Sequence, residues 1–393
     1  MDDRPSDARL DLLANLDGAL RGVELSPTQY DQLETAYHAV GNWLADSDDP
    51  LLKSARIYAQ GSVRLRTSVR PLGADHFDVD LVCLLPAAHP SVHSAVKVSE
   101  IIGKRLAESG RYKLMLEPKN RCWRLNYAES SRFHMDITPA MPNPACSQQG
   151  ILVPDRELRQ LKPSNPERYA DLFDMASKIE PTFTDLVLDF AKAIALARAE
   201  IDPLPDPMQP RDMLRRIVQL LKRHRDLYFE STDGHPPISI ILTTLAATSY
   251  GREALRTWPN PWAFIQTVLA RLPHYVQGLP GRYQVLNPSA LGENFAEKWN
   301  TEPQKATDFF KWHRLLVADV EAYQRSEGLD QRIPIMRDRL VGPETNAWHR
   351  NRLSAIQRRR TDGTLVRAPI TGGLLAAGHG TSVRANTFFG AAR

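Results

Sequence analysis

The sequence predicts an α+β protein in which a mixed N-terminal half is followed by a helical C-terminal half. Up to about residue 170, short apolar segments typical of β-strands lie between segments of helical periodicity. From about Pro181 onward, apolar residues recur three and four positions apart, which predicts helices. The length of 393 residues and the 42% share of hydrophobic residues allow two or three domains with sizeable cores.

The N-terminal half is predicted to begin with two helices, at 8–21 and 26–47. The second has a clear start, because Ser26 suits the N-cap position and Pro27 suits the first helical turn. The remaining predicted elements of this half are a strand at 55–60, a helix after Gly61-Ser62, a strand at 77–85, a helix at about 92–109 and paired strands at 121–128 and 132–138.

The second half is predicted to begin after a Pro-rich stretch at 152–169, which we interpret as irregular and as the domain crossover. The expected helices are 183–200, 211–230, 237–250, 261–271 and 304–325. After about Pro334 the periodicity ends, so an extended tail is expected, and its basic run from His349 to Arg360 is interpreted as solvent-exposed. The predicted parts of the chain are therefore 1–170, 171–334 and 335–393.

The composition indicates a cytoplasmic protein without a membrane segment. The N-terminus, MDDRPSDARLDLL, lacks the order of a secretory signal, and the apolar stretch from Ile238 to Ala247 is too short to span a bilayer. Three cysteines, at 83, 122 and 146, have neither disulfide nor zinc spacing. The net charge of +4 does not require a nucleic-acid partner.

Three aspartates occupy the polar faces of two predicted strands. In Phe77-Asp78-Val79-Asp80-Leu81, strand alternation places Asp78 and Asp80 on one face and the apolar residues on the other. Asp136 has the same placement in Phe133-His134-Met135-Asp136-Ile137. An Asp-x-Asp pair alone is commonly a strand-edge feature, but neighbouring strands would bring all three carboxylates together.

Three adjacent carboxylates repel one another, so a cation is needed to stabilise them. A pair of Mg²⁺ ions, with Mn²⁺ as a substitute, suits oxygen ligands of this kind. Two such ions about 4 Å apart hold the attacking and leaving oxygens of a phosphoryl transfer. The Gly61-Ser62 turn before the strand would then bind the phosphates of the substrate through backbone N–H groups and the Ser62 hydroxyl.

These residues resemble the signature of the DNA polymerase β-like nucleotidyltransferase superfamily. Within it, the segments LLKRHRDLYF and PISIILTTLAATSY (in 220–250) and NPSALGENFAEKW (287–299) are similar to the bacterial cGAS/DncV-like nucleotidyltransferases, the CD-NTases. The resemblance implies a polymerase β-like nucleotidyltransferase core at 1–170 and an oligoadenylate-synthase-like helical lobe at 171–334. It also implies synthesis of a cyclic di- or trinucleotide from NTPs, ATP among them, in CBASS anti-phage signalling.

Carried over to this chain, the resemblance assigns roles to seven residues. Gly61 and Ser62 would hold the donor triphosphate, and Asp78 and Asp80 would bind both metal ions. Asp136 would complete one metal site and orient the attacking hydroxyl. Lys222 and Ser239 match positions that contact phosphate. The position after Ser239 is Ile240, where relatives of the oligoadenylate-synthase type carry a base-stacking tyrosine, so base preference is left open.

Several arginines and one histidine near these motifs are also candidates for contact with the substrate. Arg64 and Arg66 follow the turn, where a triphosphate contact and a solvated helix face are equally open. Either Arg121 or Arg124 could reach the substrate from the strand before Asp136, and His134 is interpreted as a structural partner.

Two other functions stay open from the sequence: a template-independent RNA nucleotidyltransferase of the poly(A) or CCA-adding type, and a catalytically silent NTP-binding module. The chain has no His/Cys zinc cluster of the animal DNA sensor, so activation by double-stranded DNA is not expected. The ending Asn386 to Gly390 resembles the C-terminus of the family. It implies either conjugation of the tail by a CBASS accessory protein or docking of the tail on the enzyme itself.

Overall fold

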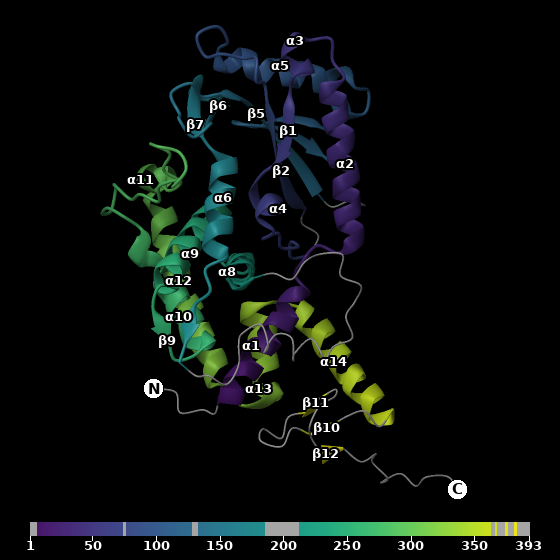
Figure 1. The fold of residues 1–393 in the computed structure, drawn as a ribbon, viewed down its shortest axis with the longest axis vertical. Coiled ribbons are helices and arrows are strands. Elements are labelled where there is room, and N and C mark those ends of the chain that lie inside the picture. Colours follow the sequence, from purple (N-terminus) through teal and green to yellow (C-terminus); the bar gives the residue numbers. More distant parts are fainter. Residues whose placement is uncertain are drawn as a thin grey trace.

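The structure is a computed structural model that describes residues 6–73, 76–127, 133–184 and 212–362, and three short strands at 366–367, 374–375 and 381–382. Figure 1 shows two stacked lobes, with a β-sheet and two flanking helices in the upper one and a helical assembly in the lower one. The short helix α4 (Gly61–Leu65) lies where the two lobes meet.

The upper lobe is built on a seven-stranded sheet among the described residues. Its main path runs β1-β2-β5-β4-β3, and β6 and β7 extend it from the end of β5. Strands β2 and β5 are parallel, whereas the other neighbours are antiparallel. The strands are β1 (Arg56–Ala59), β2 (Phe77–Leu84), β3 (Leu116–Pro118), β4 (Trp123–Asn126), β5 (Phe133–Pro142), β6 (Ile151–Asp155) and β7 (Gln160–Ser164).

One face of this sheet is covered by α2 (Pro27–Ala45) and α5 (Ala95–Glu108). Apolar residues of β2 and β5, such as Val79 and Met135, are fully buried there. The start of α2 is as predicted, because Ser26 and Gln29 form a reciprocal capping box. The opposite face of β2 carries Asp78 and Asp80 and is not covered by these two helices.

The helical lobe is organised around a single large apolar core. Its main helices are α6 (Pro166–Ser177), α8 (Met213–Glu230), α9 (Ser239–Glu253), α10 (Pro261–Ala270), α12 (Pro303–Arg325), α13 (Gly328–Ile335) and α14 (Glu344–Thr361). Helix α1 (Ser6–Arg21) also belongs to this lobe, because Leu12 and Leu16 are buried in the same core and Tyr323 Oη donates to Leu12 O at 2.8 Å.

Short elements complete the described chain. They are the α-helices α3 (Pro50–Lys53) and α11 (Glu297–Thr301), the 3₁₀ turns η1 (Tyr112–Leu114) and η2 (Leu272–Tyr275), the π-helical turn η3 (Met336–Leu340), and the two-residue strands β8 (Thr182–Phe183), β9 (Thr257–Trp258), β10 (Val366–Arg367), β11 (Leu374–Leu375) and β12 (Thr381–Ser382). None of the described helices is long and apolar enough to cross a membrane.

The prediction of an extended tail from residue 335 is wrong over residues 336–361. The segment forms η3 and α14, and α14 contains the whole basic run from His349 to Arg360. Only three residues of α14 are buried, so its packing leaves little periodicity in the sequence. Trp348 carries this packing, because it lies against Gly18 of α1, where an added Cβ would be 2.4 Å from Trp348 Nε1. The ending Asn386 to Gly390 lies outside the described residues.

The stretch 152–169 was predicted as irregular, and this is wrong as well. It forms the β6–β7 hairpin and the start of α6. Its prolines are compatible with pairing. Pro163 lies in β7, an edge strand bonded only to β6, and Pro154 lies in β6 beyond the two residues that pair with β5. Of the predicted helix 183–200, Phe183 lies in β8, and residues 185–200 lie outside the described part of the chain.

Candidate active site

The two parallel strands β2 and β5 place three aspartates on one face of the sheet. Asp80 and Asp136 are register partners, and Asp78 lies beside His134. Val79 is fully buried on the opposite face, so the predicted alternation is confirmed, and the two strands are direct neighbours in the sheet. The structure therefore brings Asp78, Asp80 and Asp136 together at the junction of the lobes.

A guanidinium group from the next strand neutralises two of these carboxylates. Arg124 of β4 is paired in register with Asp136, and its Nε and Nη2 donate to the Asp136 carboxylate at 2.7 and 2.8 Å. The same Nη2 donates to Asp78 Oδ1 at 3.0 Å. The sequence left Arg121 and Arg124 as alternatives, and the register separates them, because Arg121 pairs with Asp155 instead.

Asp80 is half-buried beside the other two carboxylates. Burial, together with the negative charges of Asp136 and Asp78, raises the pKa of Asp80 to about 7. No described side chain donates a hydrogen bond to its carboxylate. An unpartnered carboxylate in such a place favours uptake of a proton or a cation.

Gly61 is required at the start of α4 because of Asp80. Its φ of +61° lies in the left-handed region, and an added Cβ would be 2.2 Å from Asp80 Oδ2. The backbone N–H of Gln60 also donates to Asp80 O at 2.8 Å. The Gly61-Ser62 turn and the middle of β2 therefore form one unit, in which the backbone of the turn lies directly against a carboxylate.

The donor atoms fit a hard divalent cation. They are all carboxylate oxygens, which is the ligand chemistry that Mg²⁺ and Mn²⁺ prefer. Among the described residues, no group of three or more His, Cys, Asp or Glu side chains is arranged to hold a metal ion as it stands. In this cluster the Arg124 guanidinium lies against Asp78 and Asp136, where it provides the positive charge.

The remaining predicted residues lie behind this cluster or beyond it. Lys222 of α8 is buried, and its Nζ donates to Thr67 O at 3.0 Å and to Thr67 Oγ1 at 3.1 Å. Burial first, and then the nearby Arg225, lowers the pKa of Lys222 to about 7. Ser239 begins α9, and its hydroxyl accepts a hydrogen bond from Arg225. Neither side chain contacts the three carboxylates.

His134 and Ile240 each pack against another part of the protein. His134 lies edge-on to His76, with 3.2 Å between His134 Nε2 and His76 Nδ1. Ile240 is half-buried and packs against the helical core.

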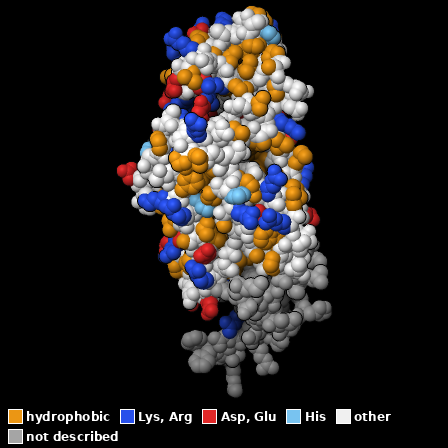
Figure 2. Space-filling view, turned by 90° about the vertical axis from the view of Figure 1, so that its left-hand side faces the viewer, with side chains coloured by type: hydrophobic (Ala, Val, Ile, Leu, Met, Phe, Trp, Pro, Cys, Tyr) orange, Lys and Arg blue, Asp and Glu red, His pale blue; other side chains and the backbone are white. Residues whose placement is uncertain are grey.

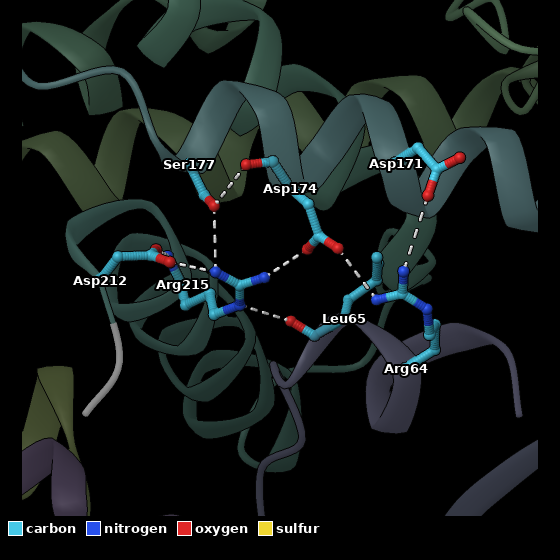
Figure 3. Close-up of polar contacts among 7 residues, drawn as sticks. All are labelled: Arg64, Leu65, Asp171, Asp174, Ser177, Asp212 and Arg215. Atoms are coloured by element: carbon cyan, nitrogen blue, oxygen red, sulfur yellow. Dashed lines mark hydrogen bonds and ion pairs between the residues drawn. The ribbon is translucent and has the colours of Figure 1, made fainter. Parts of the chain in front are cut away.

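An ion network that the sequence did not reveal joins α4 to the helical lobe (Figure 3). Arg215 of α8 contacts Leu65 O, Ser177 Oγ, Asp174 and Asp212. Asp174 also accepts from Arg64 of α4 at 3.0 Å. Arginines that are buried by tertiary structure give no periodic signal, so only the neighbouring helices identify these contacts.

Comparison with known sequences finds nucleotide second-messenger synthetases among the proteins similar to this chain. Residues 11–175 match the family described as the Second Messenger Oligonucleotide or Dinucleotide Synthetase domain, SMODS. A c-di-GMP synthase from Roseivirga ehrenbergii is 28% identical over 98% of this chain and 99% of its own length. The cyclic dinucleotide synthase CdnG from Bradyrhizobium diazoefficiens is 24% identical over 82% of this chain and 78% of its own length.

Comparison with solved structures agrees on the fold. The structure of Bradyrhizobium diazoefficiens CdnG in complex with GTP aligns with a TM-score of 0.63 and 19% identity, covering 86% of this chain and 98% of that one. Escherichia coli MS115-1 CdnC with ATP aligns with a TM-score of 0.56 and 12% identity, covering 84% and 98%. The sheet and the helical lobe are thus arranged as in these proteins.

Proposed function

We propose, from the membership of this chain in the CD-NTase family, that it condenses NTPs into a cyclic di- or trinucleotide second messenger and releases pyrophosphate. One observation carries the proposal: Asp78, Asp80 and Asp136 share one face of the sheet, directly beside the Gly61-Ser62 turn. This arrangement provides carboxylates and a backbone turn for a bound triphosphate. The second messenger would act in anti-phage defence in the cytoplasm.

The proposed reaction is attack of a ribose hydroxyl on the α-phosphorus of an NTP. Asp78 and Asp80 would hold two Mg²⁺ ions, and Asp136 would complete one of the two sites and orient the attacking hydroxyl. When bound, such ions supply activation of the hydroxyl and stabilisation of the leaving pyrophosphate. Gly61 and Ser62 would hold the triphosphate of the donor. Catalysis then depends on positioning and electrostatics, with no covalent intermediate on the protein.

Guanine nucleotides are the first substrates to test, with ATP beside them. The relative that aligns with 98% of this chain is named a c-di-GMP synthase, and the CdnG structure contains GTP. The half-buried Ile240 leaves the base without a stacking partner at that position. We therefore propose that base selection depends on other residues of the site.

The face drawn in Figure 2 does not favour the RNA nucleotidyltransferase alternative. Figure 2 shows a face on which Lys and Arg side chains are interspersed with hydrophobic and acidic ones, without gathering into one basic surface. A poly(A) or CCA-adding enzyme needs a basic RNA-binding surface.

The experiment is incubation of purified protein with all four NTPs and Mg²⁺ or Mn²⁺, followed by phosphatase treatment and mass spectrometry. A phosphatase-resistant cyclic product is expected, and its mass identifies the bases and the ring size. The control is the double variant Asp78→Ala/Asp80→Ala, which should give none. A ladder of linear products would instead support the RNA nucleotidyltransferase, and NTP binding without any product would support the silent module.

The C-terminal segment gives a second, separate proposal. We propose, from the family resemblance of the ending, that the tail is either conjugated by an accessory protein or docked on the enzyme itself, and deletion of residues 380–393 distinguishes the two. If the tail is conjugated, the deletion should leave the melting temperature unchanged and abolish conjugation. A clear loss of thermal stability would support docking.

A further inference from the structure

We infer that the helical lobe positions the Gly61-Ser62 turn through one buried polar face of α8, with Arg215 as the main positioning residue. This inference rests on the proposed function, because it concerns how the triphosphate turn is held against Asp80. The face consists of Arg215, Gln219 and Lys222, and we refer to it as the α8 polar face.

The three side chains of the α8 polar face act on one segment of backbone. They are spaced four and three residues apart, so they lie on the same side of the helix. Arg215 Nε donates to Leu65 O at 2.9 Å, Lys222 Nζ to Thr67 O at 3.0 Å and Gln219 Nε2 to Ser68 O at 3.2 Å. Their exposed fractions are 7%, 5% and 0%, so these bonds are sheltered from water.

The segment 65–68 needs these donors. Helix α4 has only five residues and ends where Arg66 adopts a left-handed conformation with φ +57°. A helix this short is not stable by itself, and the carbonyls at its end have few internal partners. The α8 polar face supplies them. It therefore determines where α4 lies relative to the sheet.

A shift at one end of α4 moves the other end. Gly61 begins this helix, and an added Cβ there would be 2.2 Å from Asp80 Oδ2, so the turn has no spare room against the carboxylate. Because α4 spans only one turn, displacement of Leu65 is transmitted directly to Gly61 and Ser62. We infer that loss of the α8 contacts misplaces the triphosphate before it affects the chemistry.

Arg215 has more partners than the other two side chains, and they come from both lobes. Its guanidinium contacts Asp174 and Ser177 of α6 and Asp212, the N-cap of α8 (Figure 3). Asp174 in turn accepts from Arg64 of α4 at 3.0 Å. The carboxylate of Asp174 therefore lies between one arginine of α4 and one of α8. It connects α4 to the helical lobe in addition to the bond between Arg215 and Leu65 O.

Lys222 receives a different role in this arrangement from the one that the family resemblance assigns. Its Nζ donates to both the carbonyl and the hydroxyl of Thr67 and is buried behind the turn. We assign it, with Gln219, to the positioning of this backbone segment.

Arg216 provides a matched control for Arg215. It is the next residue of the same helix, its exposed fraction of 8% is similar, and it is also ion-paired. Its ion-pair partners, however, are Asp17 and Glu24, at 2.8 and 2.6 Å. It also donates to Gln219 Oε1 at 2.9 Å, so it reaches the segment 65–68 only through Gln219, whereas Arg215 bonds to Leu65 O directly. A purely structural role for Arg215 predicts that the two arginines are equivalent, whereas a positioning role predicts that they differ in nucleotide binding.

The experiment compares Arg215→Gln with Arg216→Gln in the full chain. Melting temperature, the Kd of a non-hydrolysable GTP analogue, and KM and kcat of cyclic product formation are measured. We expect both variants to lose thermal stability, but only Arg215→Gln to weaken analogue binding and raise KM, by about tenfold or more. Arg215→Lys, which keeps the charge, should restore part of the loss. Backbone amides of 61–68 should exchange faster with deuterium in Arg215→Gln only.

A second pair keeps the test decisive if Arg215→Gln does not fold. Asp174→Asn removes the carboxylate shared by Arg64 and Arg215, and Asp171→Asn is its control, because Asp171 only approaches Arg64 at 3.8 Å. Equal analogue binding within either pair overturns the inference, provided that the wild-type protein binds the analogue and makes product. If the wild type does neither, the proposed function fails and the inference fails with it.

Discussion

Replacing Arg124 with glutamine should strengthen metal binding at the three carboxylates. In the structure the Arg124 guanidinium makes two hydrogen bonds to Asp136 and one to Asp78. The hydrogen bond to Asp136 is the main cause of the raised pKa of Arg124, so the side chain stays charged at any working pH. A divalent cation that binds these carboxylates must therefore displace a resident cation.

The size of the effect follows from the contacts that are lost. A hydrogen bond between charged groups contributes about 1.5–3 kcal/mol. Arg124 makes two of them to the part-buried Asp136 and one to the exposed Asp78. Solvent screening and the partial exposure of Asp78 reduce the sum, so we take the equivalent of about one such bond. This corresponds to an affinity for Mn²⁺ that is about 10- to 100-fold higher in Arg124→Gln.

The assay is titration with Mn²⁺ in the absence of nucleotide, followed by electron paramagnetic resonance or calorimetry, with melting curves of the same samples. Arg124→Gln should melt below the wild type without metal, because three carboxylates are left without a counter-ion, and regain stability with Mn²⁺. Arg121→Gln is the control, since Arg121 pairs with Asp155, and it should leave Mn²⁺ affinity unchanged. Equal or weaker Mn²⁺ binding by Arg124→Gln would refute the argument.

Three further predictions concern single features of the structure. Gly61→Ala should abolish product formation and lower the free energy of unfolding. The control is Gly73→Ala, because Gly73 has a similar φ but open space around it, and this variant should cost about 1–2 kcal/mol. The loss measured by urea unfolding should be larger for Gly61→Ala, and equal losses would contradict the close approach to Asp80. For Lys222, the folded-state pKa of about 7 lies below the unfolded value of 10.5, so its contribution should fall as pH drops from about 10.5 to about 7. Lys222→Met should therefore flatten the dependence of unfolding free energy on pH in that window, and an unchanged slope would show that the amine is not buried. Truncation after Asp362 should leave α14 and the thermal stability intact. Truncation after Pro343 removes Glu344, the ion-pair partner of the buried Arg223, and should cost about 3–5 kcal/mol. Calorimetric melting of both truncated chains measures the difference, and equal stability would show that residues 344–362 are a tail.

The sequence was sufficient to predict the carboxylate cluster, because strand alternation depends only on local geometry. Asp78 and Asp80 had to share a face once 77–85 was a strand, and Asp136 had to lie on the polar face of its own strand. The parallel register that pairs Asp80 with Asp136 is a long-range property, and the structure confirms the expected neighbourhood.

The elements that the sequence missed depend on tertiary contacts. Helix α14 has Trp348 as its one large buried side chain, so its amphipathic pattern is weak, and the Gly18 surface that receives it is more than 300 residues away. The β6–β7 hairpin was not predicted because of its prolines. They are tolerated because Pro163 lies in the edge strand β7 and Pro154 lies beyond the part of β6 that pairs with β5. From the sequence, Arg124 could not be separated from Arg121, and Arg215 was not identified at all. The register of β4 identifies the first residue, and the packing of α4 on α8 identifies the second.

The packing of α1 on distant helices has a consequence for the order in which the chain can fold. Tyr323 bonds to Leu12 across a separation of 311 residues, and Trp348 lies against Gly18. The ribosome adds about 5–20 residues per second, so α1 waits roughly 15–60 s for these partners to be synthesised. The sheet needs no residue beyond β7 for its strand pairing and can form first. During that interval α1 can pack only on helices that are made earlier, such as α8, and the part of its surface that receives Tyr323 and Trp348 stays uncovered and open to a chaperone.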